Sequence, residues 1–134
     1  MAAQGLISTQ SRFGAKETMD RLETALRAGG ATIFARIDHA AGAAAVGESL
    51  RPTEVLIFGN PKGGTPLMQA QQTIGIDLPL KALVWQDAAG AVWLSYNDPS
   101  WLAERHELGS AAAGAVANLA TMLHAMAGRA SAPS

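Results

Sequence analysis

The stretch Lys81–Asn97, with the sequence KALVWQDAAGAVWLSYN, decides the fold. Two strand-like runs, Lys81–Asp87 and Ala91–Asn97, flank a turn that begins with aspartate and ends with glycine. That arrangement is typical of a type I turn followed by a bulge. The stretch therefore predicts a β-hairpin in which Trp85 and Trp93 face each other across the two strands. A hairpin requires antiparallel pairing, so it favours an α+β design.

Three more strands are predicted before the hairpin. Val55–Gly59 is a continuous apolar run of strand length, which is typical of the middle of a sheet, so we expect a central strand there. Ala31–Ile37 alternates in the manner of a strand. Leu6–Phe13 is more polar and suits a sheet edge. The sequence thus predicts a single mixed or antiparallel sheet of about five strands.

Helices are predicted between and after the strands. In Ala15–Ala28 the apolar residues Met19, Leu22 and Leu26 form one stripe, and Gly29-Gly30 ends the helix. The other predicted helices are Ala40–Val46 behind an Asp38 cap, Pro66–Thr73 behind a Thr65 cap, a helix from Asp98-Pro99 to His106, and Ala111–Ala127.

Composition excludes several classes of protein. The chain has 134 residues, which suits one domain, and 49% of them are hydrophobic, which is enough for a core. The net charge of −1 argues against a nucleic-acid binder held by phosphate contacts. Cysteine is absent, so disulfides, thiolate nucleophiles and cysteine-ligated metals are excluded.

The two ends of the chain bear on location and assembly. Residues 1–13 lack the basic and apolar regions of a signal peptide, and the alanine-rich stretch Ala111–Gly128 is weakly apolar for a membrane span. We therefore expect a cytoplasmic protein that contacts neither membrane nor nucleic acid. From Ser110 to Ser134 the only charged residue is Arg129. Either the domain covers this helix itself, or the helix contributes to a homodimer interface, and we expect a homodimer.

A glycine-rich stretch, Gly59–Thr65, is the first candidate binding site. It is not a Walker A motif, because the lysine precedes the paired glycines. We expect a loop over Asn60–Thr65 whose free amides at Gly63, Gly64 and Thr65, with Lys62, hold an anionic group. The alternative is a tight strand-to-helix turn that needs glycine for backbone freedom and binds no ligand.

The histidines and the end of the hairpin supply further candidates. His39 follows a strand beside Asp38 and would lie near the glycine-rich stretch if its strand neighbours Val55–Gly59. It is otherwise a surface residue at a helix cap. The corner Tyr96-Asn97-Asp98 offers polar groups, although Asp98 is explained as a helix cap. The histidine spacings predict no metal site.

Several motifs resemble the domain-of-unknown-function 302 family. They are Leu50–Met68 (LRPTEVLIFGNPKGGTPLM), Gly75–Lys81 (GIDLPLK), Leu83-Val84-Trp85, Val92–Pro99 (VWLSYNDP), Glu17–Leu22 (ETMDRL) with Phe13, and Phe34–His39 (FARIDH). The resemblance implies an α+β domain of β-α-β(4)-α type, with the topology of the TATA-binding-protein-like class and helices packed on one face of the sheet. It also implies frequent dimers, and it implies no catalytic residue.

The sequence predicts one domain over residues 1–134. It consists of a family-like core at about 6–108, an alanine-rich C-terminal helix at 110–128 and a tail at 129–134.

Three classes of function remain. The first is a module that binds a small, possibly anionic ligand through His39, Asn60, Lys62, Gly63, Gly64, Thr65, Tyr96, Asn97 and Asp98. The second is a homodimeric interaction or structural protein without catalytic activity. The third is an enzyme in which His39 or His106 performs acid–base chemistry with Asp98 or Asp77. The sequence assigns no catalytic residue and identifies no cofactor, and it leaves open whether a metal or haem binds through His39 or His106.

Overall fold

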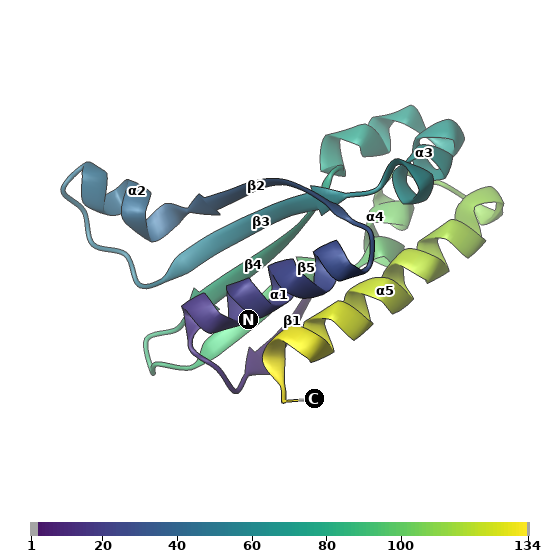
Figure 1. Ribbon diagram of the computed structural model, residues 1–134. Helices are drawn as coiled ribbons and strands as arrows, with labels where there is room; N and C mark the ends of the chain where they lie inside the picture. The colour runs from purple at the N-terminus through teal and green to yellow at the C-terminus, as the bar shows by residue number, and fades with distance from the viewer. Residues whose placement is uncertain (1–2, 134) are drawn as a thin grey trace.

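Five strands form one fully antiparallel sheet in the order β1-β5-β4-β3-β2 (Figure 1). The computed structural model describes residues 3–133. Its elements in chain order are β1 (Leu6–Ser11), α1 (Ala15–Ala28), β2 (Thr32–Asp38), α2 (His39–Ala45), β3 (Thr53–Gly59), α3 (Pro61–Ala70), the 3₁₀ helix η1 (Gln72–Asp77), β4 (Leu80–Gln86), β5 (Val92–Asn97), α4 (Pro99–Arg105), the 3₁₀ turn η2 (Ser110–Ala112) and α5 (Ala113–Ser131). The predicted α+β class is confirmed.

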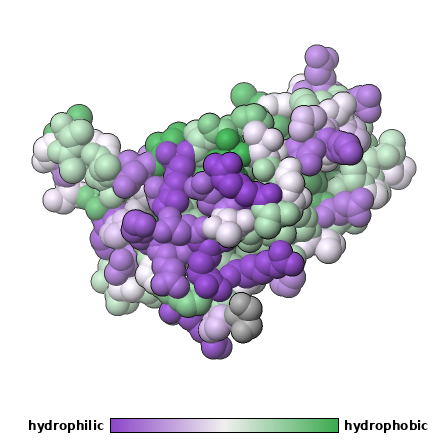
Figure 2. All heavy atoms as spheres, viewed as in Figure 1, coloured by the Kyte–Doolittle hydropathy of each residue, from purple (hydrophilic) through white to green (hydrophobic). Residues whose placement is uncertain are grey.

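The two long helices, α1 and α5, cover the same face of the sheet (Figure 1). The core lies between this helical layer and the alternate strand residues that point toward it. Its largest fully buried side chains include Met19 and Leu22 of α1, Leu56 and Phe58 of β3, and Leu94 of β5. The outer side of α1 is hydrophilic, as Figure 2 shows. This one-sided covering follows from the period of two along each strand, which gives every strand one apolar face for the helices.

The predicted hairpin is confirmed in detail. Trp85 and Trp93 are paired across β4 and β5, and their ring centroids lie 6.3 Å apart in a stacked arrangement. The Asp87 carboxylate accepts hydrogen bonds from the Trp93 indole N–H and from the amides of Ala89 and Ala91. These bonds lower the pKa of Asp87, and the bond from Trp93 has the largest effect. The turn is therefore held by a side chain that remains charged in mild acid.

The position of β3 differs slightly from the prediction. It is an interior strand, with β2 on one side and β4 on the other, but the middle of the sheet is occupied by β4. The run Val55–Gly59 is apolar on both faces: Leu56 and Phe58 are buried in the core, and Val55 and Ile57 are partly buried on the opposite face. The polar β1 pairs only with β5 and forms the expected edge.

The C-terminal helix is longer than predicted. The prediction of a tail at 129–134 is wrong for residues 129–131, which belong to α5. Ala130 and Ser131 are buried, and the Ser131 carbonyl accepts a hydrogen bond from the amide of Arg12. The Arg21 guanidinium also donates to the Arg129 and Ala132 carbonyls. These contacts satisfy carbonyls that a fraying helix end would leave to water.

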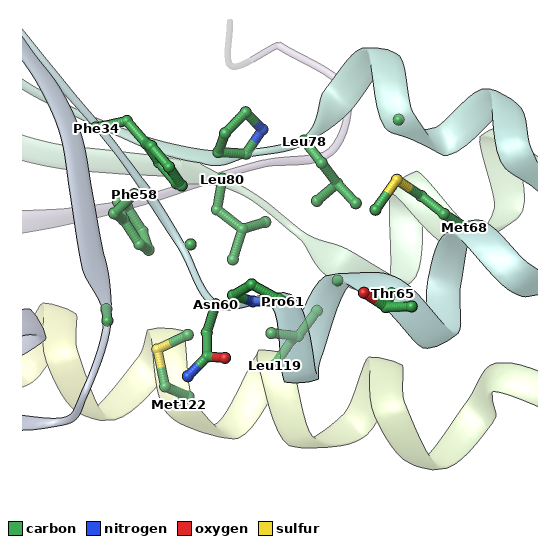
Figure 3. Close-up of a pocket in the computed structure, with 15 residues that line it drawn as sticks. Phe34, Phe58, Asn60, Pro61, Thr65, Met68, Leu78, Leu80, Leu119 and Met122 are labelled. Atoms are coloured by element: carbon green, nitrogen blue, oxygen red, sulfur yellow. The ribbon is translucent and has the colours of Figure 1, made fainter.

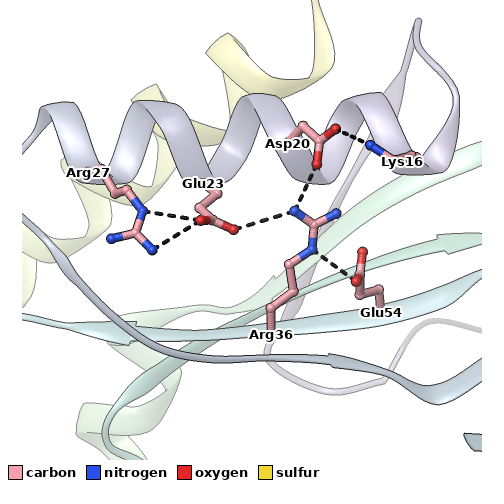
Figure 4. Close-up of polar contacts among 6 residues, drawn as sticks. All are labelled: Lys16, Asp20, Glu23, Arg27, Arg36 and Glu54. Atoms are coloured by element: carbon pink, nitrogen blue, oxygen red, sulfur yellow. Dashed lines mark hydrogen bonds and ion pairs between the residues drawn. The ribbon is translucent and has the colours of Figure 1, made fainter.

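A cluster of charged side chains joins α1 to the β2 edge of the sheet (Figure 4). Arg36 of β2 donates to Glu54 of β3 at 2.9 Å and to Asp20 of α1 at 2.8 Å, with Glu23 at 3.4 Å. The Arg36 side chain is 26% exposed, and its bond to Glu54 is the main cause of its raised pKa. The pKa of Asp20 is lowered by its hydrogen bonds to Lys16 and then to Arg36. A largely buried arginine thus binds three carboxylates, two from α1 and one from β3.

We expect the change Arg36→Met to lower the free energy of unfolding by about 2 kcal/mol, because it leaves partly buried carboxylates without their donor. Urea denaturation followed by tryptophan fluorescence measures this. The matched control is Arg27→Met, which removes an exposed i,i+4 partner of Glu23 and should cost about 0.5 kcal/mol or less. Equal losses in the two variants would contradict the anchoring role of Arg36.

Candidate functional site

An apolar cavity of about 310 Å³ opens where β3 ends and α3 begins (Figure 3). Its walls come from segments that are far apart in the sequence: the start of β2, the end of β3, α3, η1, the start of β4, and α5. The lining residues are Ala31, Phe34, Phe58, Gly59, Asn60, Pro61, Gly64, Thr65, Met68, Gly75, Leu78, Pro79, Leu80, Leu119 and Met122. Asn60 and Thr65 are the only polar residues in this lining. A space of this kind suits the apolar body of a small molecule.

Asn60 determines the shape of this end of the sheet. It is the N-cap of α3, and its side-chain oxygen accepts a hydrogen bond from the Lys62 amide at 2.9 Å. Its backbone carbonyl accepts from the amides of Gly63 and Gly64. Pro61 follows at the first helical position, where a missing N–H costs nothing. The chain therefore turns from strand to helix within one residue.

The predicted loop over Asn60–Thr65 is wrong. α3 begins at Pro61, Thr65 lies inside the helix rather than capping it, and Pro66 is an internal helix residue. The amides of Gly63 and Gly64, which were expected to be free for an anion, already donate to Asn60. The argument from unpaired amides for an anion-binding loop therefore does not hold.

The paired glycines have a packing role instead. A Cβ at Gly63 would lie 3.3 Å from the Leu119 side chain of α5, so the absent side chain lets α3 approach α5 closely. A Cβ at Gly64 would lie 3.6 Å from Leu78, on the cavity wall. The two glycines thus bring α3 against α5 and keep the space beneath it open.

A second cavity, of about 400 Å³, lies on the α5 side of Asn60. Its lining includes Lys62, Gly63 and Asn118, and it shares four residues with the first cavity: Ala31, Asn60, Leu119 and Met122. In Figure 3 the Asn60 side chain points toward Met122 of α5. Asn60, Lys62, Gly63, Gly64 and Thr65 of the predicted site are therefore brought together around adjoining cavities.

His39 is not part of this site. Its strand does neighbour β3, as expected, but the pairing is antiparallel: Thr32 lies opposite Gly59, and Asp38 lies opposite Glu54. His39, directly after Asp38, is consequently at the other end of β3 from Asn60. It is exposed at the start of α2, where Asp38 accepts the capping hydrogen bond from Ala41.

The corner Tyr96-Asn97-Asp98 lies at the same end of the sheet as Asn60 but lines neither cavity. Tyr96 is 5% exposed and belongs to the core, and burial, followed by the charge of Asp98, raises the pKa of its hydroxyl. Asp98 caps α4 by accepting from the amide of Ser100. The structure thus gives two of these residues structural roles.

His106 and Asp77, named above as a candidate acid–base pair, are in contact. The His106 Nε2 lies 2.6 Å from the Asp77 carboxylate, and its Nδ1 lies 3.0 Å from the Thr73 hydroxyl. Arg105 donates to both oxygens of the same carboxylate. Both imidazole nitrogens and the carboxylate are therefore occupied within the protein. We interpret the group as a clamp that holds η1 against α4, and thereby supports one wall of the first cavity.

Replacing His106 by alanine should lower the free energy of unfolding by about 1–2 kcal/mol, because Asp77 and Thr73 lose their partner. Hydrogen exchange measured by NMR should show faster exchange of the Ile74 and Leu78 amides, which flank Asp77. His39→Ala removes an exposed imidazole and serves as the control. Unchanged exchange in the His106 variant would show that η1 does not depend on this clamp.

Sequence reasoning missed most of the apolar lining. Phe34, Met68 and Leu78 lie in three separate family-like motifs and Met122 lies in none, and no motif shows that these side chains converge on one cavity. The one available signal was Phe34, a large aromatic residue on the polar side of an alternating strand. It is 56% exposed, which is unusual for phenylalanine.

Comparison with known proteins identifies the family of this domain. The family model described as "Domain of unknown function DUF302" matches residues 7–126. The chain belongs to the DUF302 family. The match includes most of α5, so the family pattern extends beyond the expected core at 6–108 and takes in the alanine-rich helix.

The chain is also similar to curated bacterial proteins that are named as fluoride-specific ion channels. The chain is 51% identical over 105 residues to "Fluoride-specific ion channel FluC 1" of Brucella suis biovar 1 (strain 1330) and to "Fluoride-specific ion channel FluC 2" of Brucella melitensis biotype 1 (strain ATCC 23456 / CCUG 17765 / NCTC 10094 / 16M). The aligned region is 78% of this chain but only 41% and 39% of those proteins, so the chain spans about two-fifths of the curated relatives that it matches.

A solved structure supports the fold of this DUF302 domain. It is the crystal structure of an uncharacterized conserved DUF302 protein from Bacillus stearothermophilus, with a TM-score of 0.84. The likeness covers 96% of this chain and 99% of that one, at 22% sequence identity. At this identity the likeness establishes the fold alone.

In the described part of the chain, one helical segment, Ser110–Ser131, is long and apolar enough to cross a membrane by length and composition. Core helices of soluble proteins can meet the same criterion. Here the inner side of α5 packs against the core through Val116, Leu119, Leu123 and Met126.

Proposed function

We propose that this DUF302 domain binds a small, largely apolar molecule in the cavity between the end of β3, α3 and α5. The observation that carries the proposal is the cavity itself, about 310 Å³ in volume and walled almost entirely by apolar side chains. Binding pockets of small molecules begin at about 300 Å³ and have few polar groups among apolar walls.

The arrangement of glycines supports the proposal. Gly59, Gly64 and Gly75 lie in the cavity wall. A Cβ at Gly59 would contact Phe34 and Pro79, and one at Gly75 would contact Met68. Side chains at these positions would narrow the space. The glycines in the wall therefore keep the cavity open. The flexible side chains of Met68 and Met122 can adapt to the shape of a ligand.

We expect 1-octanol, used as an apolar probe, to shift the amide resonances of Gly59, Gly64 and Leu119 in an NMR titration. The variant Gly64→Leu places a side chain in the cavity and should weaken this binding at least tenfold. The matched control is Gly114→Leu, because a Cβ at Gly114 meets no atom within 4 Å. Its affinity for octanol should equal that of the wild type.

Two outcomes would contradict the proposed cavity. One is an absence of amide shifts in the wild-type protein at concentrations up to the solubility of octanol. The other is unchanged affinity in a folded Gly64→Leu variant.

The Brucella relatives are named as fluoride-specific ion channels, and this name suggests the kind of protein in which such a domain occurs. We infer that this domain lies outside the lipid, because β1 and β2 are edge strands with unpaired backbone groups, which hydrocarbon does not tolerate. In a protein that also contains a fluoride channel, a domain of this kind would be a ligand-responsive attachment and not part of the conducting path.

A second candidate function, homodimerisation, is favoured by the uncovered face of the sheet. Within residues 3–133, both long helices lie on the opposite face (Figure 1). The uncovered face presents Ile37 of β2, Val55 and Ile57 of β3, Leu83 and Trp85 of β4, and Trp93 of β5. Ile37 is 42% exposed. The strand register gives this face little charge apart from Lys81, so a second copy of the same apolar surface is a suitable partner.

Under this proposal, Val55→Lys should convert a dimer into a monomer, because it places a charge in the centre of the apolar sheet face. Light scattering at tens of micromolar protein measures the mass. Ala117→Glu tests the α5 interface that the sequence suggested, since Ala117 is exposed on the outer side of that helix. A wild-type monomer would contradict dimerisation. If Ala117→Glu dissociates the dimer and Val55→Lys does not, the interface lies on α5 and not on the sheet face.

A further inference from the structure

We propose that the ligand of this domain is a carboxylate with an apolar chain, bound with the chain in the first cavity and the carboxylate beside Lys62 in the second. The proposal rests on the proposed function, since it assigns a chemical class to the molecule in the same cavity. It adds the head group, its partners and the direction in which the ligand lies.

The two cavities form neighbouring parts of one site. Four residues line both of them: Ala31, Asn60, Leu119 and Met122. Three of these are apolar, so a hydrocarbon chain that reached from one cavity into the other would lie along apolar side chains. Asn60 is the polar residue at the junction, and in Figure 3 its side chain points across the gap toward α5. A ligand longer than the first cavity would extend past Asn60.

The charge of the lining changes along this path. The first cavity has no ionisable side chain in its lining, and Lys62 is the single ionisable residue in the lining of the second. Among the described residues, no carboxylate forms an ion pair with Lys62, and its ammonium takes part in no hydrogen bond there. An unpaired cation at one end of an apolar path attracts a ligand with an anion at one end.

Neutral donors surround the same place. The Asn60 side-chain oxygen is used by the Lys62 amide, which leaves its NH₂ group free to donate. Asn118 of α5 is exposed and lines the second cavity. The amides of Lys62, Gly63 and Gly64 are already bonded to Asn60, so they contribute nothing. One ammonium and two amide groups match a single carboxylate, whereas a phosphate dianion is better served by several cations or by arginine.

The test compares three probes of equal chain length at pH 7: octanoate, 1-octanol and octylammonium. NMR titration of the wild-type protein should show octanoate binding several-fold more tightly than octanol, and octylammonium more weakly than octanol. Lys62→Gln should weaken octanoate binding about threefold, the scale of an exposed ion pair, and leave octanol binding unchanged. Lys16→Gln, on the outer side of α1, removes the same charge elsewhere and should change neither affinity.

The outcomes separate this inference from the proposed function. Octanol binding with no preference for octanoate, or octanoate binding that Lys62→Gln leaves unchanged, overturns the carboxylate assignment and leaves the apolar site intact. Failure of all three probes to shift the cavity amides overturns both. Equal effects of Lys62→Gln and Lys16→Gln would assign the preference to the overall charge of the protein and would overturn the role of Lys62.

Discussion

The hydrogen bonds that Asn60 accepts are the interaction on which this end of the molecule depends. Its side chain and its carbonyl hold the first three amides of α3 that can donate, directly after the last residue of β3. α3 therefore leaves the sheet in one defined direction and packs against η1 and α5. The cavity is the space that this path encloses.

The same segment shows why local sequence signals succeed at one place and fail at another. One helix-start signature, a capping residue followed by proline at the first helical position, occurs twice, at Asp98-Pro99 and at Asn60-Pro61. The first was interpreted correctly. After Asn60-Pro61, the sequence predicted a loop instead of a helix, because Gly63, Gly64 and Pro66 are all poor helix formers. Tertiary packing outweighs this propensity, because a side chain at Gly63 would crowd Leu119 of α5 and one at Gly64 would reach Leu78.

Most of the fold could be predicted because its signals are local. The hairpin needed only the spacing from Asp87 to Gly90, and α1 needed only its apolar stripe and the two glycines that end it. The candidate site could be predicted only in part, since its glycine-rich segment is continuous but its apolar walls come from six segments. The direction of strand pairing also mattered. His39 was expected near Asn60 from the neighbouring strands, and the antiparallel register places it at the opposite end of β3.

The two proposed surfaces lie on different sides of the sheet, and this affects how they could work together. The cavity is bounded by α3 and α5, on the helical side, whereas the apolar face with Trp85 and Trp93 is on the other side. β3 and β4 contribute to both surfaces, since Phe58 and Leu80 line the cavity and Val55 and Leu83 face away from it. Both proposed surfaces therefore depend on the packing of the same two strands.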